Sequence, residues 1–334
     1  MGAAWEALRP FFQRRGYMLW KRGFDLILWP DIDSDDFADT AKRSSGYEYA
    51  TQHRGLGPAP GSISNLFAFQ YLNALCRAAR KADGTDVVIR VLAIGDFGRK
   101  HVEVLKVLSM GPYAFYEDNH AIPLLEFVDF GDVTFGVFPK IGGRVEEAYR
   151  YWPKNSVGDV LDMILQCLEA LVFIHTYSIA HMDAFKDNFL VEWHPESLTT
   201  GHVARSRPRV YLTDFETAVM FSDDTPLEEC IVTGYPKGDS YLDDITKYAR
   251  AVPPEVLSGM PYDPFKLDVW QFGKSLENFR TAVPDIDRLL DALILDDAKS
   301  RPSSFDALEY LSRVIAEMPP KALLIPPETD APPL

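Results

Sequence analysis

Three oxygen-bearing side chains are spaced along this chain in a way that suits magnesium-dependent chemistry. The segment 181–188 reads H-x-D-x-x-x-x-N, so Asp183 and Asn188 share one predicted loop, and an apolar run follows it. A second short predicted strand ends in Asp214. Hard oxygen ligands on two loops suit Mg²⁺, which usually keeps waters and substrate phosphates in its shell. The pattern indicates phosphoryl transfer, in which one carboxylate orients the attacking hydroxyl while an Asn and a second Asp hold the metal.

Composition narrows the class of protein and its partners. The chain has 334 residues, 47% of them hydrophobic, which is enough for one large core or two lobes. Its formal net charge of -15 gives no electrostatic footprint for nucleic acid, so we expect no nucleic-acid partner. The three scattered cysteines match the spacing of neither a disulfide framework nor a zinc site, which fits a reducing compartment.

The sequence also argues against membrane targeting. Glu6 introduces a charge before an apolar signal-peptide core can form. The longest mostly apolar stretch, 161–174, carries Asp162 and Glu169 and does not suit a membrane span. We therefore expect a cytoplasmic protein without a membrane partner, and a nuclear location stays open.

The first half of the chain favours strands. Residues 5–12 suit a short helix, and 17–29 suit one or two strands. A β-branched run at 87–92 predicts a further strand, and apolar residues at helical spacing predict a helix over 98–109. Two more strands are predicted at 119–127 and 133–138, before a break at Pro139 to Gly143.

The second half favours helices. Apolar residues from Leu161 to Val172 recur at i, i+3, i+4 and i+7, which predicts an amphipathic helix with Ser156 as its N-cap. After Glu216 roughly forty residues lack a period, which is typical of a functional loop. Residues from about Pro319 are proline-rich, which predicts a disordered tail.

Several motifs follow one another in the order found in eukaryotic protein kinases, and over about Val87 to Leu311 the chain resembles that family. They are the catalytic loop at 181–188, the D-F-G position at 214–216, P-P-E at 253–255, D-V-W-Q-F-G at 268–273 and R-P-S at 301–303. More narrowly, these stretches are similar to the divergent protein-kinase-like proteins of basidiomycete, mushroom-forming fungi.

The resemblance implies an α+β, bilobal fold with a small β-rich N-lobe carrying one helix and a larger, mostly helical C-lobe. We assign residues 1–60 to an N-terminal extension that is partly N-lobe, and 61–139 to the N-lobe. We assign 140–316 to the C-lobe and 317–334 to the disordered tail.

The resemblance also implies a role for each matching residue, with ATP and Mg²⁺ as cofactors. Asp183 would orient the substrate hydroxyl, and Lys186 would approach the γ-phosphate. Asn188 and Asp214 would bind Mg²⁺. Arg90, paired with Glu103, would touch the α- and β-phosphates. Further pairings implied are Asp268 with the catalytic-loop backbone and Glu255 with Arg301, and His181 would be structural.

Departures from the family pattern leave three functions open. Arg90 stands in the lysine position, Met182 replaces the Arg of H-R-D, and Glu216 replaces the Gly of D-F-G. No glycine-rich phosphate loop is recognisable; we interpret 55–61 as an ordinary loop. We favour a Ser/Thr-type protein kinase with a protein substrate. The first alternative is a pseudokinase that binds or scaffolds a partner, and the second is a choline- or aminoglycoside-type small-molecule phosphotransferase.

Overall fold

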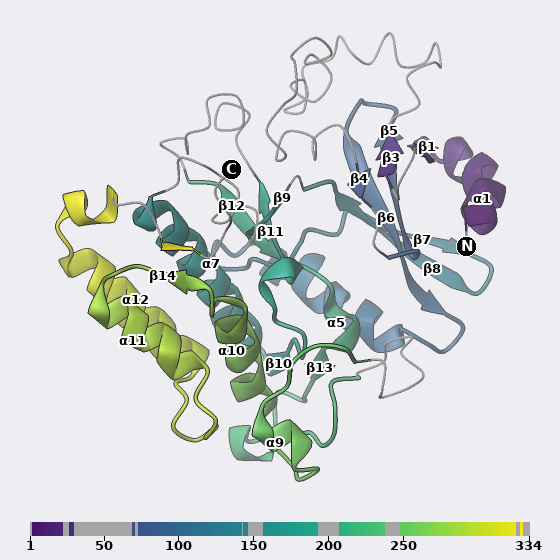
Figure 1. Cartoon of the computed structure of the whole chain (residues 1–334). Coiled ribbons are helices and arrows are strands. Elements are labelled where there is room, and N and C mark those ends of the chain that lie inside the picture. The colour runs from purple at the N-terminus through teal and green to yellow at the C-terminus, as the bar shows by residue number, and fades with distance from the viewer. Residues whose placement is uncertain are drawn as a thin grey trace. The chain divides into compact units, whose positions relative to one another are not determined.

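The computed structural model describes residues 2–22, 27–29, 69–70, 73–141, 143–145, 156–192, 207–237, 248–324 and 328–329. The chain forms two compact units (Figure 1). The first contains Met1–Gly95 and Pro123–Gly142, and the second contains Asp96–Ile122 and Gly143–Leu334. The first is rich in strands and the second in helices, which confirms the predicted α+β class. The glycine- and proline-rich break at 55–61 lies outside the described residues.

A five-stranded antiparallel sheet forms the first unit, in the order β1-β5-β6-β8-β7. Its strands are β1 (Tyr17–Leu19), β5 (Cys76–Lys81), β6 (Asp86–Ile94), β7 (Glu126–Phe130) and β8 (Val133–Pro139). Gly84 and Gly131 have positive φ in the β5–β6 and β7–β8 turns, a conformation that glycine adopts without steric cost. The predicted strands at 87–92 and 133–138 are confirmed.

The strand predicted at 119–127 is wrong in its first seven residues, because β7 begins only at Glu126. The Asn119 amide nitrogen donates to the carbonyls of Leu108 and Tyr113, each at 2.8 Å, and its oxygen accepts from the Ala121 N–H. Local side-chain bonds of this kind satisfy the backbone without a ladder. Residues 119–122 also belong to the second unit.

Helix α1 (Gly2–Arg14) packs on the five-stranded sheet, which confirms and extends the helix predicted at 5–12. Phe12 is fully buried, and its ring meets Phe135 edge-on with centroids 5.2 Å apart. The Trp5 indole donates to the Ala74 carbonyl at 2.9 Å. Large aromatic side chains contribute much of the apolar area in such a core. A second sheet contains β2 (Lys21–Arg22), β3 (Ile27–Trp29) and β4 (Phe69–Gln70). With β1, residues 17–29 contribute three strands, where the sequence predicted one or two.

The first unit also buries charge. Arg80 and Asp86 form a two-pronged ion pair at 2.6 and 2.9 Å. Lys140 follows β8, and its ammonium lies 5.4 Å from the centre of the Trp20 ring. Burial lowers the pKa of Lys140 to about 8, against a partly compensating effect of Asp86.

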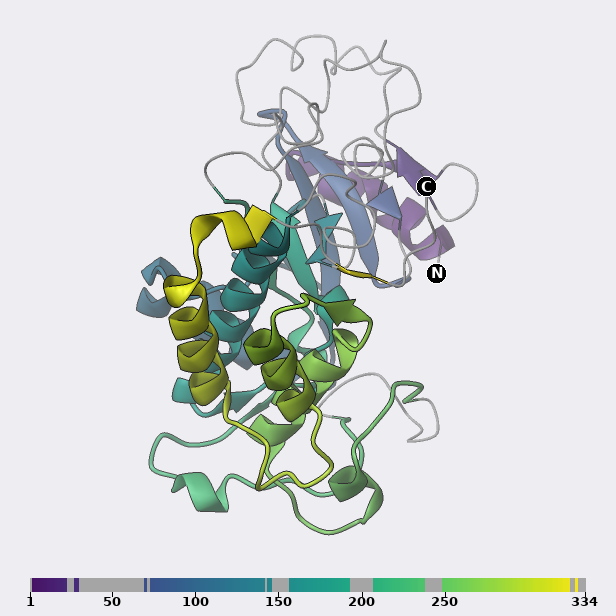
Figure 2. The same cartoon turned by 60° about the vertical axis from the view of Figure 1, so that its left-hand side comes forward.

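Helices dominate the second unit. α7, α10, α11 and α12 lie side by side (Figures 1 and 2). The helices are α5 (Arg99–Ser109), α7 (Val157–Thr176), α9 (Pro254–Leu257), α10 (Pro264–Ser275), α11 (Pro284–Leu293) and α12 (Ser304–Glu317), with 3-10 turns η1 (Pro112–Phe115) and η4 (Leu227–Glu229). Ser156 and Asp159 form a capping box at the start of α7, which confirms the predicted N-cap. Within the described ranges no helix is both long and apolar enough to cross a membrane.

Two small antiparallel arrangements position the predicted catalytic residues. β10 (Ile179–Ala180) pairs with β13 (Val219–Met220), while β11 (Phe189–Glu192) pairs with β12 (Arg209–Leu212) and β9 (Gly143–Arg144). The loop 181–188 leaves β10 and enters β11, with its last residues in the 3-10 turn η2 (Lys186–Asn188). Asp214 lies between β12 and β13, before the turn η3 (Phe215–Thr217). The pairing therefore brings both loops together.

The tail differs from the prediction of disorder at 317–334. Pro320–Leu324 forms the 3-10 turn η6, and Leu323 packs at Gly158, where an added Cβ would lie 3.0 Å from the Leu323 Cβ. β15 (Glu328–Thr329) pairs with β14 (Phe279–Arg280). Composition did not reveal these partners because they lie far away in the sequence.

Candidate catalytic site

The backbone of the catalytic loop is held by Asp268 of α10. This fully buried carboxylate accepts from the N–H groups of His181 and Met182, both at 2.7 Å, and bonds the His175 ring at 2.9 Å. Charge-assisted bonds to backbone N–H groups are among the stronger ones in proteins. The predicted contact between Asp268 and the loop backbone is confirmed.

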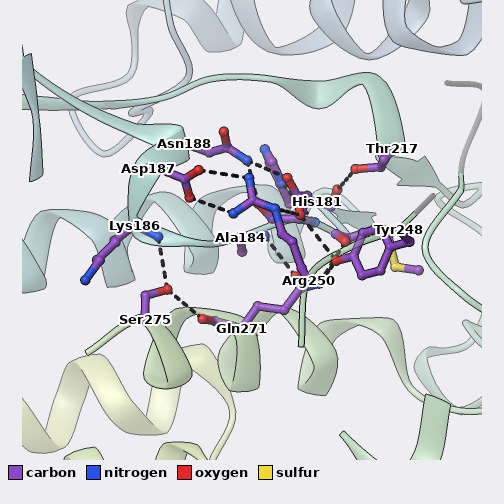
Figure 3. A network of polar contacts seen from close by, with 12 residues as sticks. His181, Ala184, Lys186, Asp187, Asn188, Thr217, Tyr248, Arg250, Gln271 and Ser275 are labelled. Atoms are coloured by element: carbon purple, nitrogen blue, oxygen red, sulfur yellow. Dashed lines mark hydrogen bonds and ion pairs between the residues drawn. The ribbon is translucent and has the colours of Figure 1, made fainter. Parts of the chain in front are cut away.

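His181 lies inside the protein and links the two loops. Its Nδ1 accepts from the Asp183 N–H at 3.2 Å, and its Nε2 therefore donates to the Thr213 carbonyl at 2.9 Å. The Thr217 hydroxyl donates to the His181 carbonyl at 3.0 Å (Figure 3). Burial lowers the pKa of His181, so the ring stays neutral. This environment agrees with the structural role that the resemblance implied.

Asp183 and Asn188 are in direct contact. The Asn188 amide nitrogen donates to Asp183 Oδ2 at 2.8 Å and to the Asp183 carbonyl at 2.7 Å. With its nitrogen committed, Asn188 has only its amide oxygen for a metal. Burial raises the pKa of Asp183 to about 7, although the nearby Arg250 and the Asn188 bond oppose the rise.

Asp214 is the third residue that the spacing predicted, and it has the left-handed values φ 69° and ψ 54°. Its charge raises the pKa of Asp183, so the two carboxylates are close enough to repel. A cation between an amide oxygen and crowded carboxylates would relieve that repulsion, so these residues fit Mg²⁺. Among the described residues, no group of three or more His, Cys, Asp or Glu side chains could hold a metal ion. Waters and phosphates would complete the shell.

Lys186 and Glu216 are also near this site in sequence. The Lys186 backbone N–H donates to Ser275 Oγ at 3.0 Å, while its side chain is directed away from Asp187 and Asn188 (Figure 3). Glu216 is half-buried in η3, two residues after Asp214. The role of Lys186 at a γ-phosphate stays a prediction.

Arg250 is a residue of this site that the sequence did not reveal. Its Nε lies 2.9 Å from Asp183 Oδ1, and its two Nη atoms donate to the two oxygens of Asp187, both at 2.9 Å. The guanidinium lies 4.8 Å from the centre of the Phe185 ring. Arg250 belongs to the long stretch without a period, where spacing gives no register, so no local pattern pointed to it.

Tyr248 is a second such residue. Its hydroxyl donates to Asp183 Oδ1 at 3.2 Å and accepts from Gln271 Nε2 at 3.0 Å. Gln271 also donates to the Met182 carbonyl and accepts from the Ala184 N–H. Burial and the adjacent Asp183 raise the pKa of Tyr248, so its hydroxyl remains a donor.

The remaining predicted residues have mixed outcomes. Glu255 and Arg301 pair at 2.8 Å, which confirms that prediction. Met182 is buried in an apolar cluster that includes Val256 and Phe265.

Arg90 is on β6 and Glu103 is on α5, in different units, so their pairing and their contact with ATP stay predictions.

No family model matches this chain. It is similar to two curated Ser/Thr protein kinases. Identity to the kinase PAK mbt of Drosophila melanogaster is 20% over 292 residues, which is 75% of this chain and 39% of that protein. Identity to the kinase ppk8 of Schizosaccharomyces pombe (strain 972 / ATCC 24843) is 25% over 171 residues, which is 51% of this chain and 25% of that protein. The chain thus matches well under half the length of either relative.

Solved structures similar to this chain include two of the Rad53 kinase domain and SCD2. One has a TM-score of 0.48 at 16% identity, covering 75% of this chain and 86% of that chain. The other, in complex with AMPPNP, has a TM-score of 0.47 at 16% identity, covering 75% and 90%. Both TM-scores are too low to support an inference about activity or ligands.

Proposed function

We propose that this chain is a divergent member of the protein kinase superfamily and transfers the γ-phosphate of ATP to Ser or Thr hydroxyls of a protein. One observation carries the proposal: Asp183 is fixed by Asn188, with Asp214 close by, on a loop anchored by Asp268. A fixed carboxylate beside two oxygen ligands for Mg²⁺ is the arrangement that phosphoryl transfer needs.

Each residue has one task in this proposal. Asp183 accepts and orients the substrate hydroxyl. Asn188, through its amide oxygen, and Asp214 hold Mg²⁺, which when bound neutralises charge on the nucleotide phosphates. The resemblance assigns Arg90, together with Glu103, to the α- and β-phosphates of ATP.

The region after Arg250 favours a protein substrate over a small molecule. Arg301 is fully buried; it pairs with Glu255 and donates to the carbonyls of Leu295 and Lys266. These bonds connect α9 and the start of α10 to the region between α11 and α12. The resemblance gives this part of the chain to kinases that act on proteins.

A pseudokinase is the second candidate. Glu216 adds a Cβ and a carboxylate to a turn in which the family pattern has glycine, and Asp214 already contributes an anion there. Extra negative charge in this turn would weaken the binding of nucleotide phosphates. This function requires a protein partner and little or no transfer.

The deciding experiment is transfer of labelled γ-phosphate from ATP, with Mg²⁺ and then Mn²⁺, to the protein itself and to a generic protein substrate. We expect transfer by the wild type and a loss of about 100-fold or more in Asp183→Asn, because general-base catalysis contributes about that much. Asp285→Asn, an exposed change on α11, is the control and should retain full activity. No transfer from folded wild type with either metal would reject the enzyme for these substrates and favour the pseudokinase.

A further inference from the structure

We propose that Arg250 is a positioning residue for Asp183, so that the end of the long segment before α9 must be in place for transfer. The proposal deepens the proposed function and rests on it. Arg250 joins the Asp183 carboxylate to the Asp187 carboxylate through three nitrogen atoms.

Donors from two segments fix the plane of the Asp183 carboxylate. Asn188 donates to Oδ2 from within the catalytic loop, while Arg250 and Tyr248 bind Oδ1 from the segment before α9. Rotation about the bond to the carboxylate would break at least one of these contacts. Because reaction rates fall steeply with misorientation of a catalytic group, holding this carboxylate has a direct effect on kcat.

The planar guanidinium suits this task better than an ammonium group. Its Nη atoms bond both oxygens of Asp187, its Nε reaches Asp183, and its face lies over the Phe185 ring. Lys provides a compact charge without the planar fork, so it would retain the attraction and lose most of the geometry. The Lys186 side chain is directed away from this network (Figure 3).

Charges around Asp183 make the position of Arg250 important. Asp187 lies on the same loop and Asp214 on the adjacent one, so Asp183 has two other carboxylates nearby. Arg250 is a cation that pairs with both Asp183 and Asp187. Without its guanidinium, Asp183 and Asp187 would repel each other and the loop would lose an attractive link to the segment.

Tyr248 gives the segment a second attachment, to α10. Its hydroxyl joins Asp183 to Gln271, and Gln271 also bonds the loop backbone at Met182 and Ala184. The contacts of Tyr248 and Arg250 both end at the Asp183 carboxylate. The orientation of this carboxylate therefore depends on whether residues 248–250 are in place.

An inhibitory role for Arg250 fits the contacts less well. Arg250 and Tyr248 both bind Asp183 Oδ1, whereas Oδ2 accepts from Asn188. An ionised carboxylate oxygen accepts about two hydrogen bonds, so Oδ2 retains an acceptor position for a substrate hydroxyl.

The test compares Arg250→Gln and Arg250→Lys with the wild type. Arg280→Gln is the matched control, because Arg280 also pairs with an Asp and its side chain is 37% exposed, against 33% for Arg250. We expect kcat to fall about 10- to 100-fold in Arg250→Gln, with KM for ATP changed by less than about threefold. Arg250→Lys should recover part of kcat, and Arg280→Gln should match the wild type. An unchanged or higher kcat in Arg250→Gln would overturn the proposal, and a higher one would show inhibition.

Asp187→Asn provides a further comparison. If Arg250 acts through its link to Asp187, the double variant Asp187→Asn with Arg250→Gln should lose no more kcat than Arg250→Gln, because both changes break the same link. Fully additive losses would contradict the link.

Amide hydrogen exchange tests the attachment without relying on activity. In Arg250→Gln we expect faster exchange in 181–188 and around Arg250, and in Arg280→Gln no change in these peptides. If the wild type transfers no phosphate but this exchange result is obtained, the attachment stands and the proposed function fails. If the wild type is active and exchange and kcat are unchanged in Arg250→Gln, the positioning role fails and the proposed function stands.

Discussion

Asp268 shows how a residue remote from the reacting groups controls the site. Its two oxygens accept from two consecutive backbone N–H groups and from a histidine, with no exposure to solvent. Buried N–H groups that lose an acceptor are costly to the fold. The conformation of the catalytic loop therefore depends on a side chain of α10.

We predict that Asp268→Asn destabilises the fold and stops transfer. The amide nitrogen of Asn would face a donor at one of the sites where Asp268 accepts. The free energy of unfolding should fall by about 3 kcal/mol, which urea titration would measure. Asp291→Asn, an exposed change on α11, should stay within about 0.5 kcal/mol of the wild type. A similarly small effect of Asp268→Asn would contradict the anchoring role.

Spacing predicted the residues of the site that are local in sequence. Asp183 and Asp214 come after strands and Asn188 comes directly before one, and each is near the others because antiparallel pairing returns the chain to the same place. Arg250 and Tyr248 were missed because their contacts depend on the path of the preceding segment, which no period describes. Their positions follow from tertiary bonds to Asp183, Asp187 and Gln271.

At the scale of elements, α10 and α11 approach closely at Gly273. An added Cβ there would lie 2.4 Å from the Leu293 Cβ and 3.0 Å from a methyl of Ile294. The close packing of α10 against α11 therefore requires a glycine at this position of the D-V-W-Q-F-G motif.

Gly273→Ala should lower stability although alanine favours helices. The gain in helix propensity is about 1 kcal/mol, whereas overpacking costs about 1–3 kcal/mol and here involves a Cβ on a rigid helix. We expect a net loss of up to about 2 kcal/mol in thermal or urea unfolding. Lys274→Ala, on the same helix at a less buried position, serves as the control. A stabilised Gly273→Ala would show that α11 moves away without cost.

Elements with strong patterns were predictable and those formed by tertiary contact were not. α7 has a long amphipathic repeat and a capping box, and its existence and N-cap were predicted. Residues 119–125 contain apolar side chains that suggested a strand, but Asn119 satisfies nearby carbonyls by itself. The spacing of apolar residues along the sequence does not predict hydrogen bonds from polar side chains such as Asn119.

For the molecule as a whole, the lowered pKa of the buried Lys140 makes the stability of the fold depend on pH. The pKa of Lys140 is about 8 in the folded chain, against 10.5 for an ordinary lysine. Between these two pH values Lys140 is therefore protonated to a greater extent in the unfolded chain than in the folded chain. Stability from this group therefore rises as pH increases from 8 to 10.5, by at most about 3 kcal/mol.

Unfolding of the wild type and Lys140→Met across this range would check the prediction. The difference in unfolding free energy between them should change with pH in favour of the wild type. An exposed change, Lys299→Met, should show no such trend. Parallel curves for wild type and Lys140→Met would show that Lys140 is not desolvated.

The division predicted from the sequence assigned all of residues 61–139 to one lobe. Residues 96–122, which include α5, group with the helical unit, although they lie between strands of the β-rich unit in sequence. The Ile122 N–H bonds the Leu212 carbonyl, and the Leu212 N–H bonds the His120 carbonyl. Such long-range backbone bonds depend on the fold and have no local signature.

The pairing of β15 with β14 covers backbone N–H and C=O groups of β14. β14 consists of Phe279–Arg280, and the strand that pairs with it comes from residues whose composition predicted a disordered tail. A chain shortened after residue 316 would leave those backbone groups bare, and a bare strand edge recruits strands from other molecules. Shortened versions of this protein would therefore be expected to self-associate, even with every residue of the catalytic loop intact.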